Sequence, residues 1–484
     1  MQLVLLCRET DLKYFGHEAI FGPVVNEIKD IEINGLRLSD GNIIKGTLHS
    51  IVGDNLGSHM IGGFLECFSC EYFCRYCCIS KTDFHNDVSP SLGRRRTIEN
   101  YEECFGELND NPGFESYMGI KSNSLFNRLN YYHVVSGLPP CLGHDLFEGV
   151  VSYDMKLMID FFIKSLKWFT FDKLNRHIEK FRYVGKDALD KPAPVTVSSE
   201  RIGGHAVQNW VFVRLFSLII GVYIQDVDDE VWQLYLKLKL IVELICSPTI
   251  SYGQIAFLQI SIDEYLENRI KCFPEHRLRP KHHFIQHYPE LILKFGPLIR
   301  LWTMRFESKH SYFKECARKL KNYKHLTKTL CGRHQFLQSY YSVGSLFKDD
   351  LSDDGSLPFE PHMYSDSINN AIKAKGFNTS TRISSKIIYK GTEYKCHMMV
   401  TVNSNNIGLL FGKIQSIIIH NLMPYLIVDV YQGTPVSCFG VFSVEDYHIN
   451  TLCLSISELV DPYPISVYCI NGSNYISAKH HVEH

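Results

Sequence analysis

Residues 72–77 read YFCRYC, and the predicted architecture follows from the two cysteines of this segment. Cys74 and Cys77 form a C-x2-C pair, which can supply two thiolates to one metal ion from a single tight loop. The chain has 16 cysteines and begins without a secretory signal pattern, so reduced, metal-binding thiols are expected before disulfides. Buried thiols without a metal are the alternative, and Cys67 with Cys70 is a competing pair.

Three histidines later in the chain can complete this metal site. His282, His283 and His287 lie at the start of a helix expected over residues 281–294. His283 and His287 are four positions apart and therefore share one face of that helix, whereas His282 would pair with His287 if the helix began later. The expected site is a structural zinc ion held by the cysteine pair, His287 and either of the other two histidines.

This zinc site would bring two distant carboxylates toward one place. Asp54 follows a strand expected at residues 47–52 and lies 20 positions before Cys74. Glu307 lies 20 positions after His287. Paired carboxylates that bind Mg²⁺ or Mn²⁺ are part of what two-metal phosphoryl transfer on DNA requires. Each residue alone is more often a turn residue or a solvated helix residue, so the expectation depends on the combined pattern.

Four segments carry a resemblance to a known family. They are GDNLG at residues 53–57, YFCRYC at 72–77, HDLFEGV at 144–150 and RFESKH at 305–310. Together they resemble the DDE transposases of the CACTA-Mirage-Chapaev, or EnSpm-like, group, over about residues 1–345. The resemblance implies an RNase H-like core with a large helical insertion. It also implies that Asp54 is the second catalytic carboxylate, that Glu307 is the third, and that the cysteines and histidines above are zinc ligands.

The first carboxylate of that family has no counterpart at the expected place. Asp11 follows a strand expected at residues 3–7, but only 43 positions separate it from Asp54, and these already contain an expected helix. Two further strands with their turns would need about 15–20 more residues. The sequence therefore predicts an N-terminally truncated core that is inactive in DNA strand transfer. The alternatives are an active Mg²⁺-dependent transposase with a carboxylate from another position, and a zinc-stabilised protein-interaction scaffold.

Composition and charge limit the kinds of partner that the chain can bind. Lys and Arg total 50 and Asp and Glu total 52, so DNA binding needs local basic patches rather than a global field. The candidate patches are Arg94, Arg95 and Arg96, and Lys319, Lys321, Lys324 and Lys328. A solvated face is the plain alternative for both. We expect double-stranded DNA at transposon ends as the partner, with a second copy of the chain as a further candidate and neither a membrane nor a small-molecule substrate. The expected location is the nucleus.

His144, Asp145 and Glu148 in the third segment allow two interpretations. Asp145 can cap a helix while Glu148 completes a capping box. His144 and Glu148 also share a helix face and can hold a metal ion. The sequence favours the capping interpretation.

The expected fold class is α/β plus all-β. The expected parts are a first piece of the RNase H-like core at residues 1–64, a zinc-bearing helical insertion at 65–280, core helices at 281–345, a linker at 346–383 and a small β-barrel domain at 384–484. The longest apolar run, residues 211–224, is interrupted by Arg214 and is interpreted as a buried helix.

Overall fold

The structure is a computed structural model that describes residues 2–86, 93–343, 350–353, 355–377 and 381–482. It combines helices with a C-terminal antiparallel sheet. This confirms the expected mixture of helical and strand segments. The chain divides into two compact units. Unit 1 is Met1–Ser152 with Pro248–Gly344, and unit 2 is Tyr153–Ser247 with Ser345–His484.

Unit 1 is mainly helical. Its elements are α1 (Glu9–Ile33), β1 (Leu36–Arg37), β2 (Ile43–Ile44), α2 (Asn55–Gly62), α3 (Lys81–Asn86), α4 (Ile98–Asp110), η2 (Leu125–Arg128), α5 (Val134–Gly137), η3 (Gly143–Val151), α10 (Tyr252–Cys272), α11 (Pro280–Gln286), α12 (Tyr288–Phe295), η6 (Leu298–Leu301), α13 (Met304–Leu320) and α14 (Leu326–Val343). A core of Val25, Phe64, Tyr101, Ile120 and Phe126 joins the first half of these helices.

Two strands expected in this unit do not form. Residues 3–7 have no regular structure before α1, and residues 47–52 are also irregular. A strand needs a neighbour for its backbone groups. The backbone of the second segment instead bonds to the end of α5, from the amide of Ile51 to the carbonyl of Gly137 at 2.9 Å. The described strands of unit 1 are β1 and β2, a short antiparallel pair, so an RNase H-like core stays a prediction.

The helices of unit 2 precede its sheet in the sequence. They are α6 (Ser152–Lys164), α7 (Phe171–Lys180), η4 (Gly185–Ala188), α8 (Ala206–Ile220), η5 (Gly221–Tyr223) and α9 (Glu230–Ile245). The buried helix expected at residues 211–224 is formed by α8 with η5. Ala206–Tyr223 is long and apolar enough to cross a membrane by length and composition alone. Most of this segment is buried inside the protein, however, as in the core helix of a globular domain.

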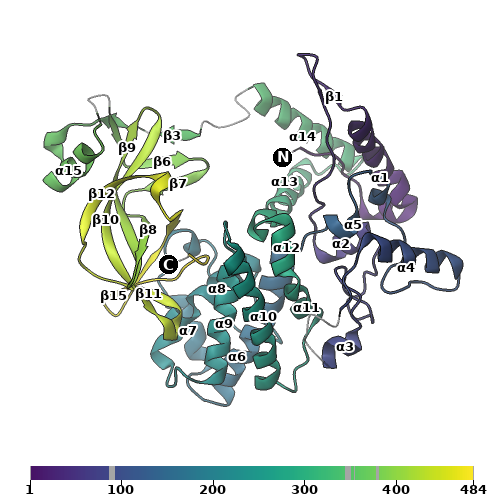
Figure 1. Ribbon diagram of the computed structural model, residues 1–484, viewed down its shortest axis with the longest axis horizontal. Coiled ribbons are helices and arrows are strands. Elements are labelled where there is room, and N and C mark those ends of the chain that lie inside the picture. The colour runs from purple at the N-terminus through teal and green to yellow at the C-terminus, as the bar shows by residue number, and fades with distance from the viewer. Residues whose placement is uncertain (1, 87–92, 344–349, 354, 378–380, 483–484) are drawn as a thin grey trace. The chain divides into compact units, whose positions relative to one another are not determined.

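The rest of unit 2 is dominated by antiparallel strands (Figure 1). Its elements are β3 (Leu351–Asp353), β4 (Leu357–Pro358), η7 (Pro361–Met363), α15 (Asp366–Ala374), β5 (Arg382–Ser384), β6 (Lys386–Tyr389), β7 (Thr392–Lys395), β8 (Met399–Asn405), β9 (Gly408–His420), β10 (Met423–Val436), η8 (Ser437–Phe439), β11 (Val441–Val444), β12 (Asn450–Ser455), η9 (Ile456–Glu458), β13 (Asp461–Ile465), β14 (Val467–Ile470) and β15 (Ser473–Ile476). The main path of the large sheet is β13-β8-β9-β10-β11-β15-β14, and β3, β6 and β7 form a second sheet.

The long strands β9 and β10 bury both of their faces. Ile417 and Leu426 lie in one apolar cluster, while Ile418 and Ile427 pack in another with Ile372 of α15. The linker expected at 346–383 is therefore wrong, because this stretch contains β3, β4 and α15. The strands β3 and β4 pair with β6 and β5, and α15 packs on the large sheet through Ile372. A closed barrel stays a prediction.

The sheet is not a domain of its own, because α6 to α9 share its unit. The side chain of Asp187 in η4 explains part of this. Arg214 of α8 donates to its Oδ1 at 2.7 Å, and the hydroxyl of Tyr468 in β14 donates to its Oδ2. Arg214 is only 2% exposed. The domain boundary expected at residue 384 did not take this contact into account, because Asp187 and Tyr468 lie 281 positions apart in the sequence.

Replacing Asp187 with Asn should destabilise unit 2 by about 3–5 kcal/mol, because it leaves the Arg214 guanidinium buried without its counter-charge. Urea unfolding followed by circular dichroism measures the loss. The control is Glu393→Gln, which removes an exposed ion pair with Lys386 and should cost less than about 1 kcal/mol. Equal losses in the two variants would contradict this account.

The same pair sets a pH dependence. Burial alone would raise the pKa of Asp187, but the Arg214 charge and the Tyr468 hydrogen bond outweigh burial and hold that pKa below its ordinary value. Because the folded pKa lies below the unfolded value of about 3.9, the contribution is complete at neutral pH and is lost as the pH falls below about 4. In Asp187→Asn this part of the acid sensitivity should disappear.

Candidate metal centre

Four predicted ligands converge in unit 1. Cys74 and Cys77 lie in the loop between α2 and α3, His283 lies in α11, and His287 is the junction of α11 and α12. All four ligand atoms lie within 4.8 Å of one another. The site brings together Cys77 and His283, which are 206 positions apart in the sequence. These four side chains can hold a metal ion such as zinc.

The separations between ligand atoms suit a tetrahedral ion. Cys74 Sγ is 3.5 Å from His287 Nε2, and Cys77 Sγ is 3.1 Å from His283 Nε2. The two Nε2 atoms are 3.0 Å apart. Zn–S bonds of about 2.3 Å and Zn–N bonds of about 2.0 Å give tetrahedral edges of about 3.3–3.8 Å. A small expansion of the cluster would therefore accommodate the ion.

Surrounding groups fix the ligands in place. His283 Nδ1 lies 2.9 Å from Gln286 Oε1, and such an outer contact orients the ring so that Nε2 faces the metal. Arg96 donates to the carbonyl of Cys74 at 3.1 Å. A side chain at Gly93 would collide with Cys77, since its Cβ would lie 2.8 Å from Sγ.

His282 takes a different role from the other two histidines. It is buried, and its Nδ1 accepts a hydrogen bond from the amide of Arg279 at 3.0 Å, at the start of α11. The open choice between His282 and His283 is thus decided for His283, because α11 begins early enough to place positions 283 and 287 on one side. Cys67 and Cys70 belong to neither cluster of potential ligands among the described residues.

Burial and the neighbouring ligand groups shift the pKa values of this site. Burial alone would raise the pKa of Cys74, but the hydrogen bond with Cys77 and the charges of His283 and His287 hold it well below the ordinary value. The hydrogen bond with Cys74, together with burial, raises the pKa of Cys77. Burial lowers the pKa of His287 and so favours the neutral ring that binds metal. The second thiol needs a cation beside it to lose its proton.

A buried polar network links this loop to two other motif segments. Arg75, between the two cysteines, is 1% exposed and donates to Asn55 Oδ1 at 2.8 Å and to the carbonyl of Pro139 at 3.3 Å. Asn55 in turn donates to Oδ1 of Asp145. Sequence reasoning did not single out Arg75 or Asn55. The only available signal was their position inside two of the motif segments.

Asp145 does not cap a helix, so the capping interpretation is wrong. It lies within η3, is fully buried, and is bonded to Asn55 rather than to the amides of a helix start. Burial raises the pKa of its carboxyl, and the nearby Arg75 opposes that rise. The capping-box spacing could not show that this helix start is enclosed by the rest of unit 1.

Glu307 lies in a second cluster of potential ligands, with Cys141 and His144. Its Oε1 accepts from Thr303 Oγ1 at 2.9 Å, and that hydroxyl lies 3.2 Å from Cys141 Sγ. The hydrogen bond with Cys141 raises the pKa of His144 to about 9, with further support from the carboxylates of Glu148 and Glu307. The fourth motif segment therefore meets the third.

Asp54 belongs to neither cluster among the described residues. It is the N-cap of α2, where its Oδ1 accepts from the amide of Gly57 at 2.6 Å. Its neighbour Asn55 bonds Asp145, which is adjacent to His144 in the second cluster. The segments that carry Asp54 and Glu307 are thus connected through η3, but the two carboxylates do not form a common ligand set with a third group.

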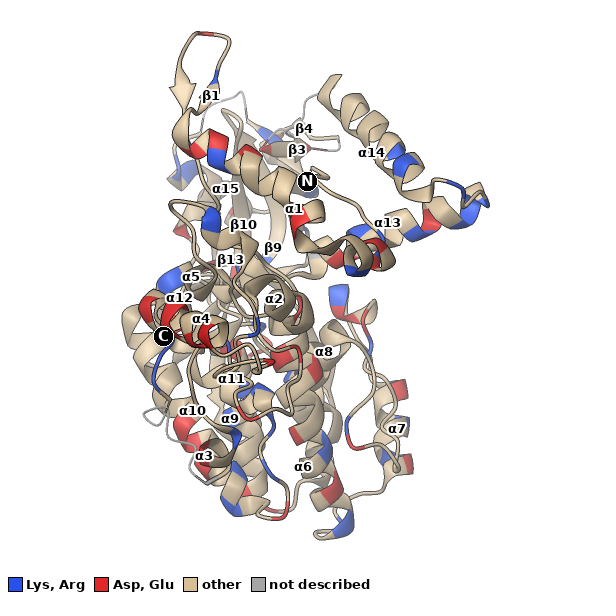
Figure 2. Cartoon of the chain, turned by 90° about the vertical axis from the view of Figure 1, so that its right-hand side faces the viewer, with Lys and Arg blue, Asp and Glu red and all other residues tan. Residues whose placement is uncertain are grey.

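The two expected basic patches differ in how exposed their side chains are. Lys319, Lys321, Lys324 and Lys328 are all exposed, and Figure 2 shows Lys and Arg gathered where α13 ends and α14 begins. Arg94 is exposed, and Arg95 pairs with Glu290. Arg96 is buried and bonds the carbonyls of Cys74 and Met118, so the expectation that it contacts DNA is wrong.

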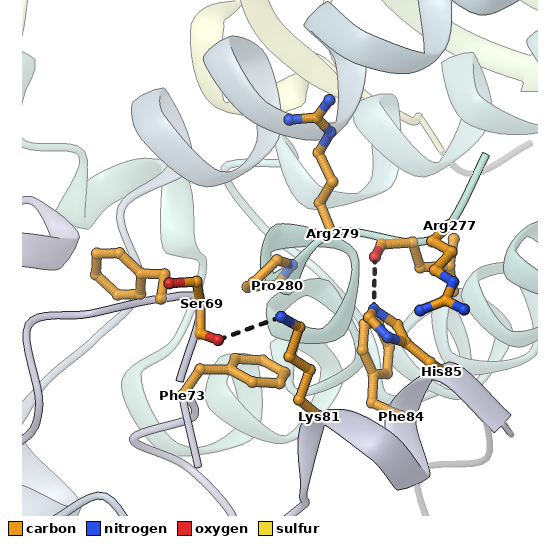
Figure 3. A pocket seen from close by; sticks show the side chains of 10 residues that line it. Ser69, Phe73, Lys81, Phe84, His85, Arg277, Arg279 and Pro280 are labelled. Atoms are coloured by element: carbon orange, nitrogen blue, oxygen red, sulfur yellow. Dashed lines mark hydrogen bonds between the residues drawn. The ribbon is translucent and has the colours of Figure 1, made fainter. Parts of the chain in front are cut away.

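A pocket of about 300 Å³ lies next to the metal centre (Figure 3). Its lining is Phe68, Ser69, Phe73, Lys81, Phe84, His85, Arg277, Leu278, Arg279 and Pro280. Phe73 and Phe84 also contact the ring of His283, with centroids 5.4 and 5.2 Å away. In Figure 3 Lys81 donates to the carbonyl of Ser69, and His85 bonds the carbonyl of Leu278, each at 3.2 Å. The pocket therefore combines aromatic walls with basic groups.

Comparison of the sequence with models of known protein families and with curated proteins finds no match.

Replacing Cys74 with Ser should remove the bound metal and leave unit 1 sensitive to protease, because a structural metal site contributes about 10–16 kcal/mol of apparent binding free energy to folding. Elemental analysis of the purified chain and limited proteolysis check this. Cys67→Ser is the matched control, since Cys67 lies in the same loop but is exposed, and it should retain both metal and resistance. Equal metal content in the two variants would contradict the assignment of ligands.

Proposed function

We propose that this chain is a transposase-derived DNA-binding protein of the nucleus, in which a zinc ion holds a DDE-type region together, and that the chain itself does not cut or join DNA. The observation that carries the proposal is the convergence of the four motif segments. Residues 72–77 bind α11 through the metal ligands and contact residues 53–57 through Arg75, while residues 144–150 reach both Asn55 and Glu307. Segments that merely resembled a family by chance would have no reason to meet.

The proposed inactivity follows from how the two carboxylates are used. Two-metal phosphoryl transfer needs ions about 4 Å apart that are bridged by a shared carboxylate. Asp54 has one oxygen engaged as a helix cap, and Glu307 is grouped with a thiol and an imidazole instead of with other carboxylates. Mg²⁺ requires oxygen ligands in near-ideal octahedral geometry, so this arrangement would hold it poorly.

DNA binding is supported by the exposed lysines that follow the Glu307 helix. Four lysines within ten positions, Lys319 to Lys328, lie on α13, α14 and their connection. Of these, Lys319 is paired with Glu315 on its own helix at 2.6 Å. Exposed lysines at such spacing can neutralise successive phosphates, although the chain as a whole has a net charge of −2.

Changing Lys321, Lys324 and Lys328 to Ala should weaken duplex binding uniformly across sequences. Each lysine that no longer neutralises a phosphate should also reduce the slope of log K against log salt by about 1. Fluorescence anisotropy at several salt concentrations measures both effects. The control changes three exposed lysines of unit 2, Lys373, Lys390 and Lys395, to Ala. If the wild-type chain does not bind DNA, the zinc-stabilised interaction scaffold becomes the better proposal.

Strand transfer is tested separately. With transposon-end duplexes and either Mg²⁺ or Mn²⁺, the 484-residue chain should give no nicking or joining above a protein-free control. Cleavage that disappears in both Asp54→Ala and Glu307→Ala would overturn the proposed inactivity and identify the chain as an active enzyme.

A further inference from the structure

Cys141 and His144 form a C-x2-H pair whose role is left open by the function proposed above. We propose that Cys141, His144 and Glu307 bind a second thiophilic divalent cation, of the class of Zn²⁺ or Co²⁺, in a site separate from the Cys74 centre. The inference goes beyond the proposed function and does not depend on DNA binding.

The geometry of the three ligands fits such an ion. Their ligand atoms lie within 4.8 Å of one another, and Cys141 Sγ is 3.2 Å from His144 Nδ1. This spacing is close to the tetrahedral S–N edge of about 3.5 Å that zinc bond lengths give. Cys141 is completely buried, while His144 is partly exposed and Glu307 is exposed. The sulfur thus forms the floor of the site, and the other two ligands lie toward solvent.

The ligands are held by contacts that do not involve a metal. Thr303 Oγ1 lies between the thiol of Cys141 and the carboxylate of Glu307, 3.2 Å from the first and 2.9 Å from the second. The rings of Phe147 and Trp302 stack at 5.3 Å and 22°, which fixes η3 beside the start of α13. A preformed set of ligands loses little conformational entropy when an ion binds.

The kind of ligand selects the kind of ion. Thiolate and imidazole are soft or borderline ligands that favour zinc and related transition metals over Mg²⁺. Three protein ligands leave the fourth tetrahedral position open, in contrast with the closed Cys74 centre, where four protein ligands are available. The second site would therefore accept water or an external ligand at its exposed side.

Metal titration of the full chain tests the proposal. The metal-depleted protein is titrated with Co²⁺ and Zn²⁺, and binding is followed by native mass spectrometry and by the sulfur-to-cobalt absorption band. The wild-type chain should bind two equivalents. Glu307→Gln and Cys141→Ser should each weaken one equivalent by at least about tenfold, since even groups that only support a ligand account for about 10–100-fold in affinity.

The control is Glu315→Gln, which changes an exposed glutamate of the same helix and should leave both equivalents unchanged. Glu307 is exposed, so its variant keeps the test valid if the buried Cys141→Ser variant does not fold. Binding of a single equivalent by the wild-type chain would overturn the proposal. A second equivalent of unchanged affinity in Glu307→Gln would also overturn it.

Discussion

The contact between the Cys74–Cys77 loop and the α11–α12 junction is the constraint on which unit 1 depends. It joins positions 206 residues apart, and closing a flexible loop of that length costs on the order of 5 kcal/mol of chain entropy. Apolar packing around Phe73, Phe84 and Phe284 offsets part of that cost. A bound metal would supply about 10–16 kcal/mol more, enough to make closure decisive. Without it, the ligand side chains and this apolar packing would have to hold α11 against the loop.

Arg75 couples this contact to two other segments of unit 1. Its guanidinium is buried, stacks over Tyr76 at 4.5 Å, and donates hydrogen bonds to Asn55 and to the carbonyl of Pro139. A buried charge is tolerated only with such partners, so moving α2 or η3 would leave it uncompensated. The metal centre, the segment after Asp54 and the HDLFEGV segment therefore depend on one another, although none is adjacent to another in the sequence.

The members of the Cys/His cluster that could hold a metal were predictable from the sequence because the spacing within each pair is local. A C-x2-C turn and histidines four apart on a helix place donor atoms without knowledge of the fold. The strands expected at residues 3–7 and 47–52 failed because an apolar run specifies burial but not a pairing partner. The expected domain boundaries differ from the observed units for a related reason. Residues 153–247 join the C-terminal strands through contacts such as Asp187 with Tyr468, which no local pattern announces.

The way the chain alternates between its units has a consequence for synthesis. Each unit is built from two separate stretches, so neither can be completed until a later part of the chain has been translated. Ribosomes add about 5–20 residues per second, so Cys74 and Cys77 wait roughly 10–40 s for His283 to emerge. During that interval the paired thiols are open to oxidation, to premature capture of metal and to chaperones. Nascent unit 1 thus depends on the reducing capacity of its surroundings until His283 and His287 have been made.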